Sequence, residues 1–307
     1  MEECVRSVFE AKFHRKNLHF TQSGTHALHW ILKGLSLSPQ DKVILPTYVC
    51  RSLYLAVVNA GCKPILCDIG TYWHVSPETV KSKVSKNTKV VVLVNLFGTF
   101  LDCSQFRIPG VVLINDLCQS CDVLSVPDRE HGDFILYSFG PTKLLHAGGG
   151  GAFSICNTEI KFRNYIEEDF FGYRFGGCPS HLNLTILKEQ FLYYEDIKQR
   201  RQEIAERYFN CIPSEYTKFI EKTGNVFFRF PLIQNKKSFE SLCRGFFERA
   251  IVVRRGVDRL IHRLLGYPDV LYPNAVRAFN GSISIPIYPS LTLVDQNKVI
   301  EAVNLLL

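Results

Sequence analysis

The feature that most constrains the fold is a regular alternation of short apolar runs with helix-like segments from residue 20 onward. The apolar runs cover residues 42–45, 64–67, 89–94, 111–114 and 134–138. Strands that alternate with helices in this way form a mostly parallel sheet, joined by right-handed crossovers and covered by helices on both faces. The pattern therefore predicts an α/β fold whose large domain is a three-layer α/β/α structure.

The second part of the chain has a different character. A helical pattern over residues 183–208 predicts one long linking helix. Beyond it we expect a strand over 226–232, a helix over 239–249 and a last helix over 294–306. A chain of 307 residues is long enough for a large domain and a smaller appendage. We predict a large domain over residues 1–210 and a smaller α+β domain over residues 211–307.

Polar residues and glycine follow several of the expected strands. Asp116 follows the run at 111–114, Ser138 ends the run at 134–138, and Thr25 follows a short extended stretch. Ligands of parallel sheets lie at the carboxyl ends of the strands, so we expect one crevice to collect these residues. Gly24 also opens a helical pattern, and a helix that begins at glycine exposes backbone N–H groups that suit a phosphate.

The segment from Ser138 to Gly151 places Lys143 between a hydroxyl group and a run of four glycines. A lysine held near an anion and partly withdrawn from water can lose its proton and attack an aldehyde, as lysine does with pyridoxal phosphate. By itself the segment is equally compatible with a solvated lysine before a flexible turn. Asp116 favours the first interpretation, because a carboxylate can keep a pyridinium nitrogen protonated.

The order of the motifs resembles that of the DegT/DnrJ/StrS family. Ser-Gly-Thr begins at Ser23, Pro-x-Tyr-x-Cys-x-Ser at Pro46, Asp-x-x-Gln at Asp116 and Ser-Phe-x-Pro-Thr-Lys at Ser138, and the likeness continues through residues 284–292 and the final helix. Members of this family are sugar aminotransferases that use pyridoxal 5′-phosphate. The resemblance therefore implies this cofactor and the aspartate-aminotransferase fold, known as fold type I.

The resemblance implies a role for each matched residue. Lys143 would hold the cofactor as a Schiff base and move a proton between substrate and cofactor. Asp116 would pair with the pyridinium nitrogen, although a carboxylate that caps a turn is the alternative. Gln119 matches a family residue that contacts the ring or its hydroxyl oxygen, and a turn-stabilising amide is nearly as plausible.

Other residues match family positions that contact the phosphate of the cofactor or one face of its ring. Ser138 would bind the phosphate through its hydroxyl, and Gly24, Thr25 and the backbone N–H of His26 would bind it at the helix start. Cys50 aligns with the aromatic residue that many relatives place over the ring, so a sulfur contact replaces the aromatic stack or Cys50 is an ordinary thiol. Tyr48 is an alternative neighbour of the ring.

Asn183 resembles the family asparagine that reaches the cofactor phosphate of the neighbouring subunit, which implies a homodimer. Thr185 stands where relatives carry a basic residue two positions later. A helix N-cap is the other interpretation of Asn183, and the two do not exclude each other.

Some positions depart from the family pattern. Asn95 stands where relatives usually carry histidine, and Gly149 replaces a frequent glutamate. The chain also starts close to the Ser-Gly-Thr motif and has a short connection between Phe100 and Val111, so an N-terminal helix and a crossover helix of the family are expected to be reduced or missing. Asn95 and Gly149 are expected to lie near the substrate side of the site, so these departures concern the identity of the amino-group acceptor.

Composition narrows the environment and the partners. The net charge of +7 favours anionic partners, but no Lys/Arg run with interleaved aromatic residues is present, so we expect phosphate-bearing substrates and no nucleic acid. Eleven cysteines without the paired spacing of zinc sites indicate free thiols in a reducing compartment. Cys118 and Cys121, with His131 as the nearest further candidate ligand, fall short of a metal site.

No apolar run approaches the roughly 18 residues that a membrane span needs, and the chain begins with acidic residues, unlike a signal peptide. We therefore expect a cytoplasmic protein with no membrane partner.

Taken with the resemblance, these observations imply an aminotransferase that moves an amino group, from glutamate as the amino-acid donor, to a nucleotide-linked keto-sugar. Two alternatives stay open. A sugar dehydratase would use the same cofactor, but such relatives carry histidine where this chain has Lys143. A cofactor-binding or regulatory protein without turnover is the other, in which substrate access would have been lost along with the reduced N-terminal and crossover segments.

Overall fold

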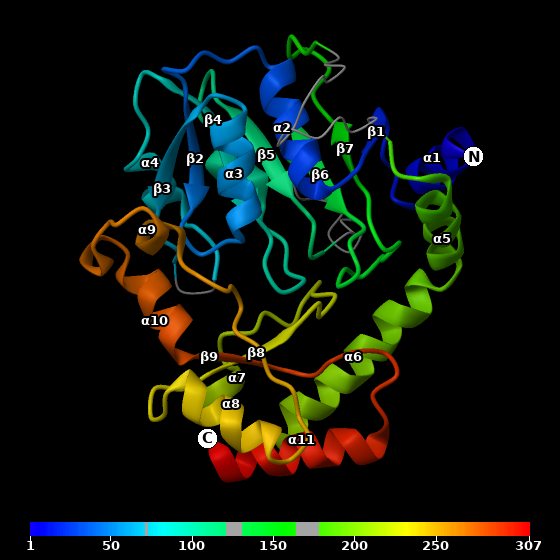
Figure 1. Ribbon diagram of the computed structural model, residues 1–307, viewed down its shortest axis with the longest axis vertical. Coiled ribbons are helices and arrows are strands. Elements are labelled where there is room, and N and C mark those ends of the chain that lie inside the picture. The colour runs from blue at the N-terminus through cyan, green and yellow to red at the C-terminus, as the bar shows by residue number, and fades with distance from the viewer. Residues whose placement is uncertain (71–72, 121–130, 164–177) are drawn as a thin grey trace.

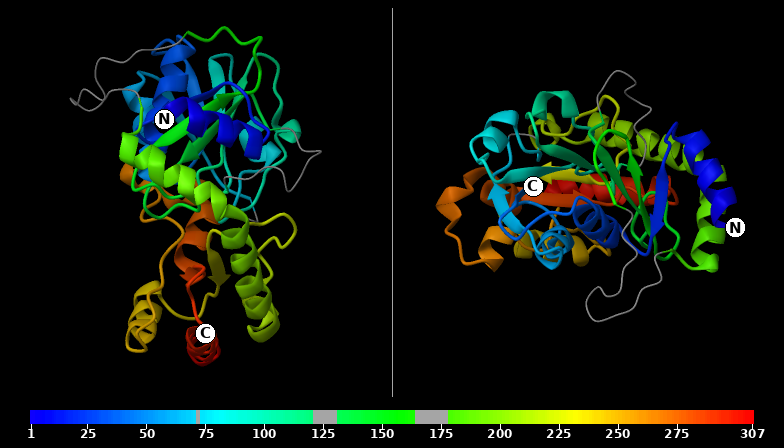
Figure 2. Two further views of the ribbon diagram at one scale, coloured as in Figure 1. Left: turned by 90° about the vertical axis from the view of Figure 1, so that its right-hand side faces the viewer. Right: turned by 90° about the horizontal axis from the view of Figure 1, so that it is seen from above.

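The computed structural model describes residues 1–70, 73–120, 131–163 and 178–307. Figure 1 shows a large lobe that contains the main sheet and a smaller lobe beneath it, and the left view of Figure 2 shows the same two lobes from the side. The large lobe contains α1 (Glu2–Lys12), β1 (Leu18–Thr21), α2 (Gly24–Gly34), β2 (Lys42–Pro46), α3 (Arg51–Asn59), β3 (Lys63–Cys67), α4 (Pro77–Lys81), β4 (Thr88–Val94), η1 (Cys103–Phe106), β5 (Val112–Asp116), β6 (Phe134–Ser138), β7 (Gly151–Ile155) and α5 (His181–Leu192).

The smaller lobe is built mainly from the C-terminal third of the chain. It contains α6 (Tyr194–Cys211), α7 (Ser214–Thr217), β8 (Phe230–Ile233), α8 (Phe239–Phe247), β9 (Ser282–Ile285) and α11 (Leu293–Leu306). The chain also contains α9 (Ile261–Leu264), η2 (Asp269–Leu271) and α10 (Pro273–Gly281), and residues of α9 and α10 join the core of the large lobe. No helix in the described ranges is long and apolar enough to cross a membrane.

The described residues form a seven-stranded sheet in the order β1-β7-β6-β5-β4-β2-β3. The pairs from β6 through β3 are parallel, and β7 is antiparallel to both of its neighbours. This mostly parallel sheet with helices on both faces confirms the predicted α/β fold class. The five apolar runs correspond to β2, β3, β4, β5 and β6, whereas the sequence did not indicate β7.

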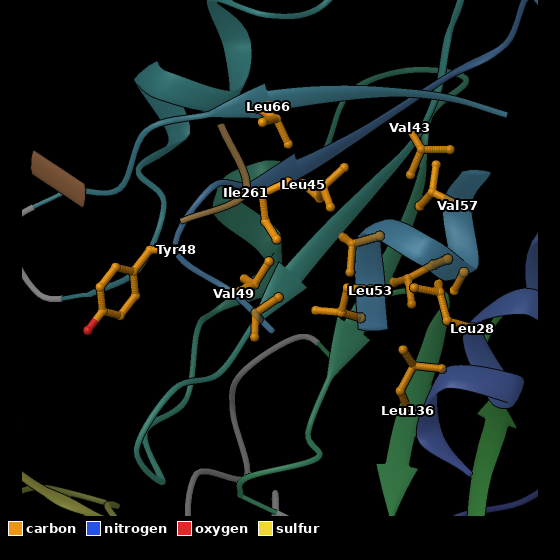
Figure 3. Packing of buried hydrophobic residues seen from close by; sticks show 14 of the residues in the cluster. Leu28, Val43, Leu45, Tyr48, Val49, Leu53, Val57, Leu66, Leu136 and Ile261 are labelled. Carbon is orange, nitrogen blue, oxygen red and sulfur yellow. The ribbon is translucent and has the colours of Figure 1, made fainter. Parts of the chain in front are cut away.

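Alternate residues of the central strands enter two different cores, because successive side chains of a strand point to opposite faces. Val43 and Leu45 of β2 pack with α2 and α3 in one cluster, which Figure 3 shows from close by. Ile44 lies in a second cluster with Val80 of α4 and Phe106 of η1. Since both faces of β2 are covered by apolar side chains, the strand reads as a continuous apolar run.

A third cluster covers the β1–β7 end of the sheet. Phe9 of α1 lies against Tyr137 of β6 and Phe191 of α5, with ring centres 4.9 and 5.7 Å apart. An N-terminal helix of 11 residues is therefore present, while the connection after Phe100 contains only the four-residue η1. The prediction that the crossover helix is reduced agrees with this geometry.

The single helix predicted over residues 183–208 is wrong, because α5 ends at Leu192 and α6 begins at Tyr194. Tyr193 has φ −102° and ψ 5°, a conformation that interrupts the helical hydrogen-bond ladder. Glu195 and Asp196 then stabilise a new start, since acidic groups are favourable at a helix N-terminus. Figure 1 shows α5 and α6 running in different directions.

The strand predicted over residues 226–232 is also shorter than expected. Val226 donates its N–H to the carbonyl of Gly98 in the large lobe at 3.0 Å, and Phe227 has a left-handed φ of 48°. Because these residues are held by the large lobe, strand pairing begins only at Phe230, where β8 pairs antiparallel with β9.

The chain returns to the large lobe after residue 256. Leu260 and Ile261 belong to the cluster that covers β2 and β4, and so do Ala275 and Ala278 of α10. The carboxylate of Asp68, just after β3, accepts the N–H groups of Asn274 and Ala275, both at 2.9 Å. It therefore serves as a distant cap for the start of α10.

His74 is a buried histidine that fastens the turn after β4. Its Nδ1 donates to the carbonyl of Val94 at 3.1 Å, and its Nε2 lies within hydrogen-bond distance of the Thr99 hydroxyl. Burial lowers the pKa of His74 from 6.5 to about 4. The unfolded chain therefore binds more protons than the folded protein between these pH values, so stability is complete above pH 6.5 and falls as the pH falls toward 4.

We expect His74 to cost about 3 kcal/mol of unfolding free energy across this window, at about 1.4 kcal/mol per pKa unit. Urea unfolding of the wild type and of His74→Asn at pH 7 and pH 4 measures the effect, since asparagine retains a donor for Val94. The variant should lose less stability on acidification. The pKa of His131 is also lowered to about 4. His131→Gln therefore measures how much of the pH dependence of stability comes from this second histidine. Equal pH dependence in wild type and His74→Asn would contradict this assignment.

Candidate functional site

The predicted site residues gather at the carboxyl ends of the parallel strands. β5 ends at Asp116 and β6 ends at Ser138, while β1 leads into Gly24 at the start of α2, and Cys50 is the residue before α3. This edge of the sheet faces the smaller lobe, because Lys143, in the loop after β6, lines one cavity together with residues of that lobe.

Asp116 and Lys143 lie in the same site. Asp116 is 5% exposed, and its Oδ1 accepts the N–H of Cys118 at 2.8 Å. Burial raises the pKa of Asp116, while hydrogen bonding to Cys118 and the charge of Lys143 act to lower it. The Asp116 carboxylate and the Lys143 amine therefore interact electrostatically. They are the pair that the sequence analysis assigned to the ring nitrogen and the aldehyde of one cofactor.

Two thiols complete this group. Burial first, and the Asp116 carboxylate second, raise the pKa of both Cys50 and Cys118, and Lys143 opposes the shift in each. Cys50 is nevertheless exposed to solvent in the structure. Both cysteines are therefore neutral thiols beside the lysine.

The start of α2 has the geometry of an anion site. Ser23 caps the helix, and its hydroxyl accepts the N–H of His26 at 3.1 Å. The N–H groups of Gly24 and Thr25 belong to the first turn, where no intrahelical acceptor exists. Gly24 and Thr25 are thus the stronger candidates for a phosphate, and the His26 N–H, which we also predicted, is engaged by the cap in this structure.

Ser138 lies next to this helix start. A Cβ atom added at Gly24 would lie 3.0 Å from both Ser138 Cβ and Cys118 Sγ. One added at Gly151 would collide with the backbone of Ser23 and Gly24. The two glycines are required because β7, β6 and α2 approach each other so closely here.

Gln119 and Tyr48 differ in their access to the site. Gln119 Oε1 accepts the N–H of Phe97 at 2.8 Å, as a turn-stabilising amide does, and this bond leaves its amide nitrogen as a donor. Tyr48 is fully buried, with its hydroxyl 3.3 Å from Ser282 Oγ and a pKa raised by burial to about 12. Figure 3 shows its ring turned away from the labelled aliphatic side chains. Cys50, rather than Tyr48, is near Lys143.

Asn183 lies against the glycine run. Its Nδ2 donates to the carbonyl of Ala147 at 2.6 Å, and its side chain lies beside Gly149. The alternative N-cap interpretation is wrong, because Ser180 caps α5 and accepts the N–H of Asn183 at 3.1 Å. Contact with a neighbouring subunit stays a prediction.

Asn95 is fully buried and holds the loop that follows β4. Its Nδ2 donates to the Asn115 side chain and to the carbonyl of Asp116, and its Oδ1 accepts the N–H of Leu101 at 2.6 Å. It therefore orients the backbone beside Asp116. No group of three potential metal-ligating residues is found in the described ranges, and Cys121 lies outside them.

The cavity beside Lys143 has a volume of about 760 Å³. Phe228, from the smaller lobe, places its ring centre 5.7 Å from Lys143 Nζ. The charged residues that line the cavity are Lys143, Arg201, Arg229, Arg249, Arg254, Asp295 and Lys298. The sequence analysis missed Phe228 and these arginines, because their segments share no motif with Lys143 and meet it only through the fold.

These groups fit pyridoxal phosphate. A buried carboxylate is available for the ring nitrogen, an amine for the aldehyde, and helix N–H groups with a hydroxyl for the phosphate. The acidic, basic and anion-binding groups come from three different strand ends, as a ligand at the edge of a parallel sheet requires.

Comparison with known proteins agrees with this description. "Spore coat polysaccharide biosynthesis protein SpsC" of Bacillus subtilis is 24% identical over 96% of this chain and 86% of its own length. The "dTDP-3-amino-3,6-dideoxy-alpha-D-galactopyranose transaminase" of Aneurinibacillus thermoaerophilus is 26% identical over 92% of this chain and 83% of its own length.

Solved structures show the same fold. DesV of S. venezuelae has a TM-score of 0.85 at 22% identity and matches 98% of this chain and 87% of its own. The aminotransferase TlmJ of Streptoalloteichus hindustanus has a TM-score of 0.84 at 20% identity and matches 98% and 89%. The family model for DegT/DnrJ/EryC1/StrS aminotransferases matches residues 6–304. With its buried carboxylate and lysine at the shared edge of the sheet, the chain belongs to the DegT/DnrJ/EryC1/StrS aminotransferase family.

Proposed function

We propose that this protein transfers an amino group, from glutamate as donor, to the ketone carbon of a nucleotide-linked sugar. The chain is a pyridoxal-phosphate-dependent aminotransferase of a family that acts on sugars. The observation that carries the finer proposal is the cation-rich cavity that opens beside Lys143, which suits a phosphate-bearing acceptor. The Aneurinibacillus relative, whose name specifies a dTDP-linked sugar, supports the same substrate class.

The residues of this chain would divide the work as follows. Pyridoxal phosphate, when bound, supplies an electron sink for charge that develops at the reacting carbon. Lys143 Nζ binds the aldehyde and then carries a proton to and from the substrate carbon. Asp116 holds the ring nitrogen protonated, and burial strengthens that interaction because it lowers the local dielectric. Gly24, Thr25 and Ser138 orient the phosphate.

The proposal is tested by incubating the purified holoenzyme with glutamate and a panel of free, phosphorylated and nucleotide-linked keto-sugars. Mass spectrometry should detect an aminated sugar only with the nucleotide-linked members, together with 2-oxoglutarate. Aspartate and alanine in place of glutamate test the donor. Amination of free sugars at the same rate would contradict the acceptor class.

The same incubation separates the alternatives. A dehydratase would release a product lighter by one water and without added nitrogen. A regulator would bind the cofactor and exchange no amino group with any donor. One relative of 24% identity, from Geobacillus stearothermophilus, is named "Pleiotropic regulatory protein". This name is the reason to test for a regulator.

We further propose that the enzyme acts as a homodimer in the cytoplasm. The half-buried Asn183 beside the glycine run supports a shared site, and the described cysteines, all free thiols, suit a reducing compartment. Sedimentation of the holoenzyme measures its mass directly.

A further inference from the structure

The smaller lobe brings positive charge to the cavity beside Lys143, and Asp295 is the one carboxylate among the described residues that line it. Arg229 and Arg254 of the smaller lobe line this cavity. The carboxylate of Asp295 accepts a hydrogen bond from the Thr292 hydroxyl at 2.7 Å and lies 3.7 Å from Lys298 Nζ, so its charge is already engaged. The Arg229–Arg254 end of the cavity therefore has an excess of cations.

Arg229 and Arg254 are near enough for their charges to interact, and Arg229 is half-buried whereas Arg254 is exposed. Burial lowers the pKa of Arg229 most, and the neighbouring Arg254 lowers it further, while Tyr48 and Asp258 act in the opposite direction. Arg229 is held in position, because its Nη1 donates to the carbonyl of Arg255 at 2.6 Å. Two neighbouring guanidinium groups repel each other unless an anion lies between them.

Ser284 provides a neutral donor at the same place. Its N–H donates to the carbonyl of Arg254 at 2.7 Å, and the N–H of Arg254 donates back to the carbonyl of Ser284 at 3.1 Å. Ser284 is only 6% exposed, and its hydroxyl oxygen has no hydrogen-bond partner within the part of the chain that the structure describes. A buried hydroxyl without a partner is costly unless a ligand satisfies it.

We propose that Arg229, Arg254 and Ser284 form a phosphate subsite that anchors the acceptor sugar for transfer at Lys143. The guanidinium N–H groups and the Ser284 hydroxyl would donate to the non-bridging oxygens of one phosphate. Charge-assisted bonds of this kind are the strong ones in proteins, and the planar arginine fork matches phosphate geometry. The inference rests on the proposed function and specifies the residues that select its substrate.

The phosphate chemistry is shared by a sugar monophosphate and by the diphosphate of a nucleotide-linked sugar. Arg249 and Lys298 line the same cavity and would extend the site for a longer anion. A diphosphate is therefore expected to bind more tightly than a monophosphate.

The test measures binding to the holoenzyme by calorimetry, with inorganic phosphate, inorganic pyrophosphate, glucose 6-phosphate and a nucleoside diphosphate as probes. The variants are Arg254→Gln and Ser284→Ala, and the matched control is Arg259→Gln, which removes one charge from an exposed residue outside the cavity. Arg254→Gln should weaken pyrophosphate and nucleoside diphosphate binding about 10–100-fold, and Ser284→Ala about 5–10-fold. Arg259→Gln should change neither.

The outcomes separate this inference from the proposed function. Equal losses in Arg254→Gln and Arg259→Gln would indicate general attraction rather than a subsite and would overturn the inference, as would a wild type that binds none of the four probes. Tighter binding of glucose 6-phosphate than of the nucleoside diphosphate would support the subsite and contradict the nucleotide-linked acceptor. Failure of glutamate to change the cofactor spectrum would instead count against the aminotransferase function, whatever the probes do.

Discussion

Replacement of Lys143 by alanine is expected to lower transamination by at least about 10⁴-fold and to abolish covalent attachment of the cofactor. The expected loss is large because Lys143 is assigned two tasks, attachment and proton transfer, and proton transfer by a positioned group alone accounts for about 10²–10⁴-fold. Reduction with borohydride followed by intact-mass measurement tests attachment, since the wild type should retain the cofactor mass and the variant should not.

Lys143→Arg is the matched variant. Arginine keeps a positive charge near the Phe228 ring and Asp116, but it does not lose its proton at neutral pH and cannot form the bond. It should therefore be as inactive as the alanine variant while unfolding at a similar temperature to the wild type. Activity within tenfold of the wild type in either variant, or cofactor mass retained after reduction, would remove Lys143 from the mechanism.

Replacement of Asp116 by asparagine is expected to lower turnover by about 10²–10³-fold while the cofactor stays bound. Asparagine has the same shape and still accepts the N–H of Cys118, but it lacks the charge that would keep the ring nitrogen protonated. The loss of one buried electrostatic group aimed at developing charge typically has this magnitude. Steady-state rates, together with the absorbance of the bound cofactor, measure the effect.

Stability distinguishes this role from a structural one. Burial raises the pKa of Asp116, so the charged carboxylate is costly to the folded protein without cofactor. Asp116→Asn should therefore unfold at the same temperature as the wild type or higher. Asp102→Asn, which changes a carboxylate that caps η1, is the control and should retain turnover. A normal rate in Asp116→Asn would contradict its pairing with the ring.

The parts of the fold that sequence reasoning found are those with a local signal. β2 and β4 were visible because both of their faces are buried, which leaves a continuous apolar run. β7 was not found, since its start at Gly151 lies within the glycine run and its pairing with β1 and β6 is antiparallel. The break at Tyr193 was missed because the helical pattern continues through it.

The candidate site divides in the same way. Gly24, Ser138 and Asp116 each stand at a strand end or a helix start, where the local pattern alone indicates ligand binding. Phe228 and Arg254 have no such pattern. They reach the site because the chain crosses to the smaller lobe through α6 and the lobe then packs over the loop that carries Lys143.

The sequence alone determined the layered sheet, the ordered motifs and the lysine and carboxylate at one edge, because strand periodicity and short spacings are local properties. Tertiary structure alone decided which cations face Lys143, which amides remain available at α2, and where residues 257–278 return to the large lobe. These outcomes depend on contacts between segments far apart in the chain, and no local pattern records which distant surfaces will bury each other.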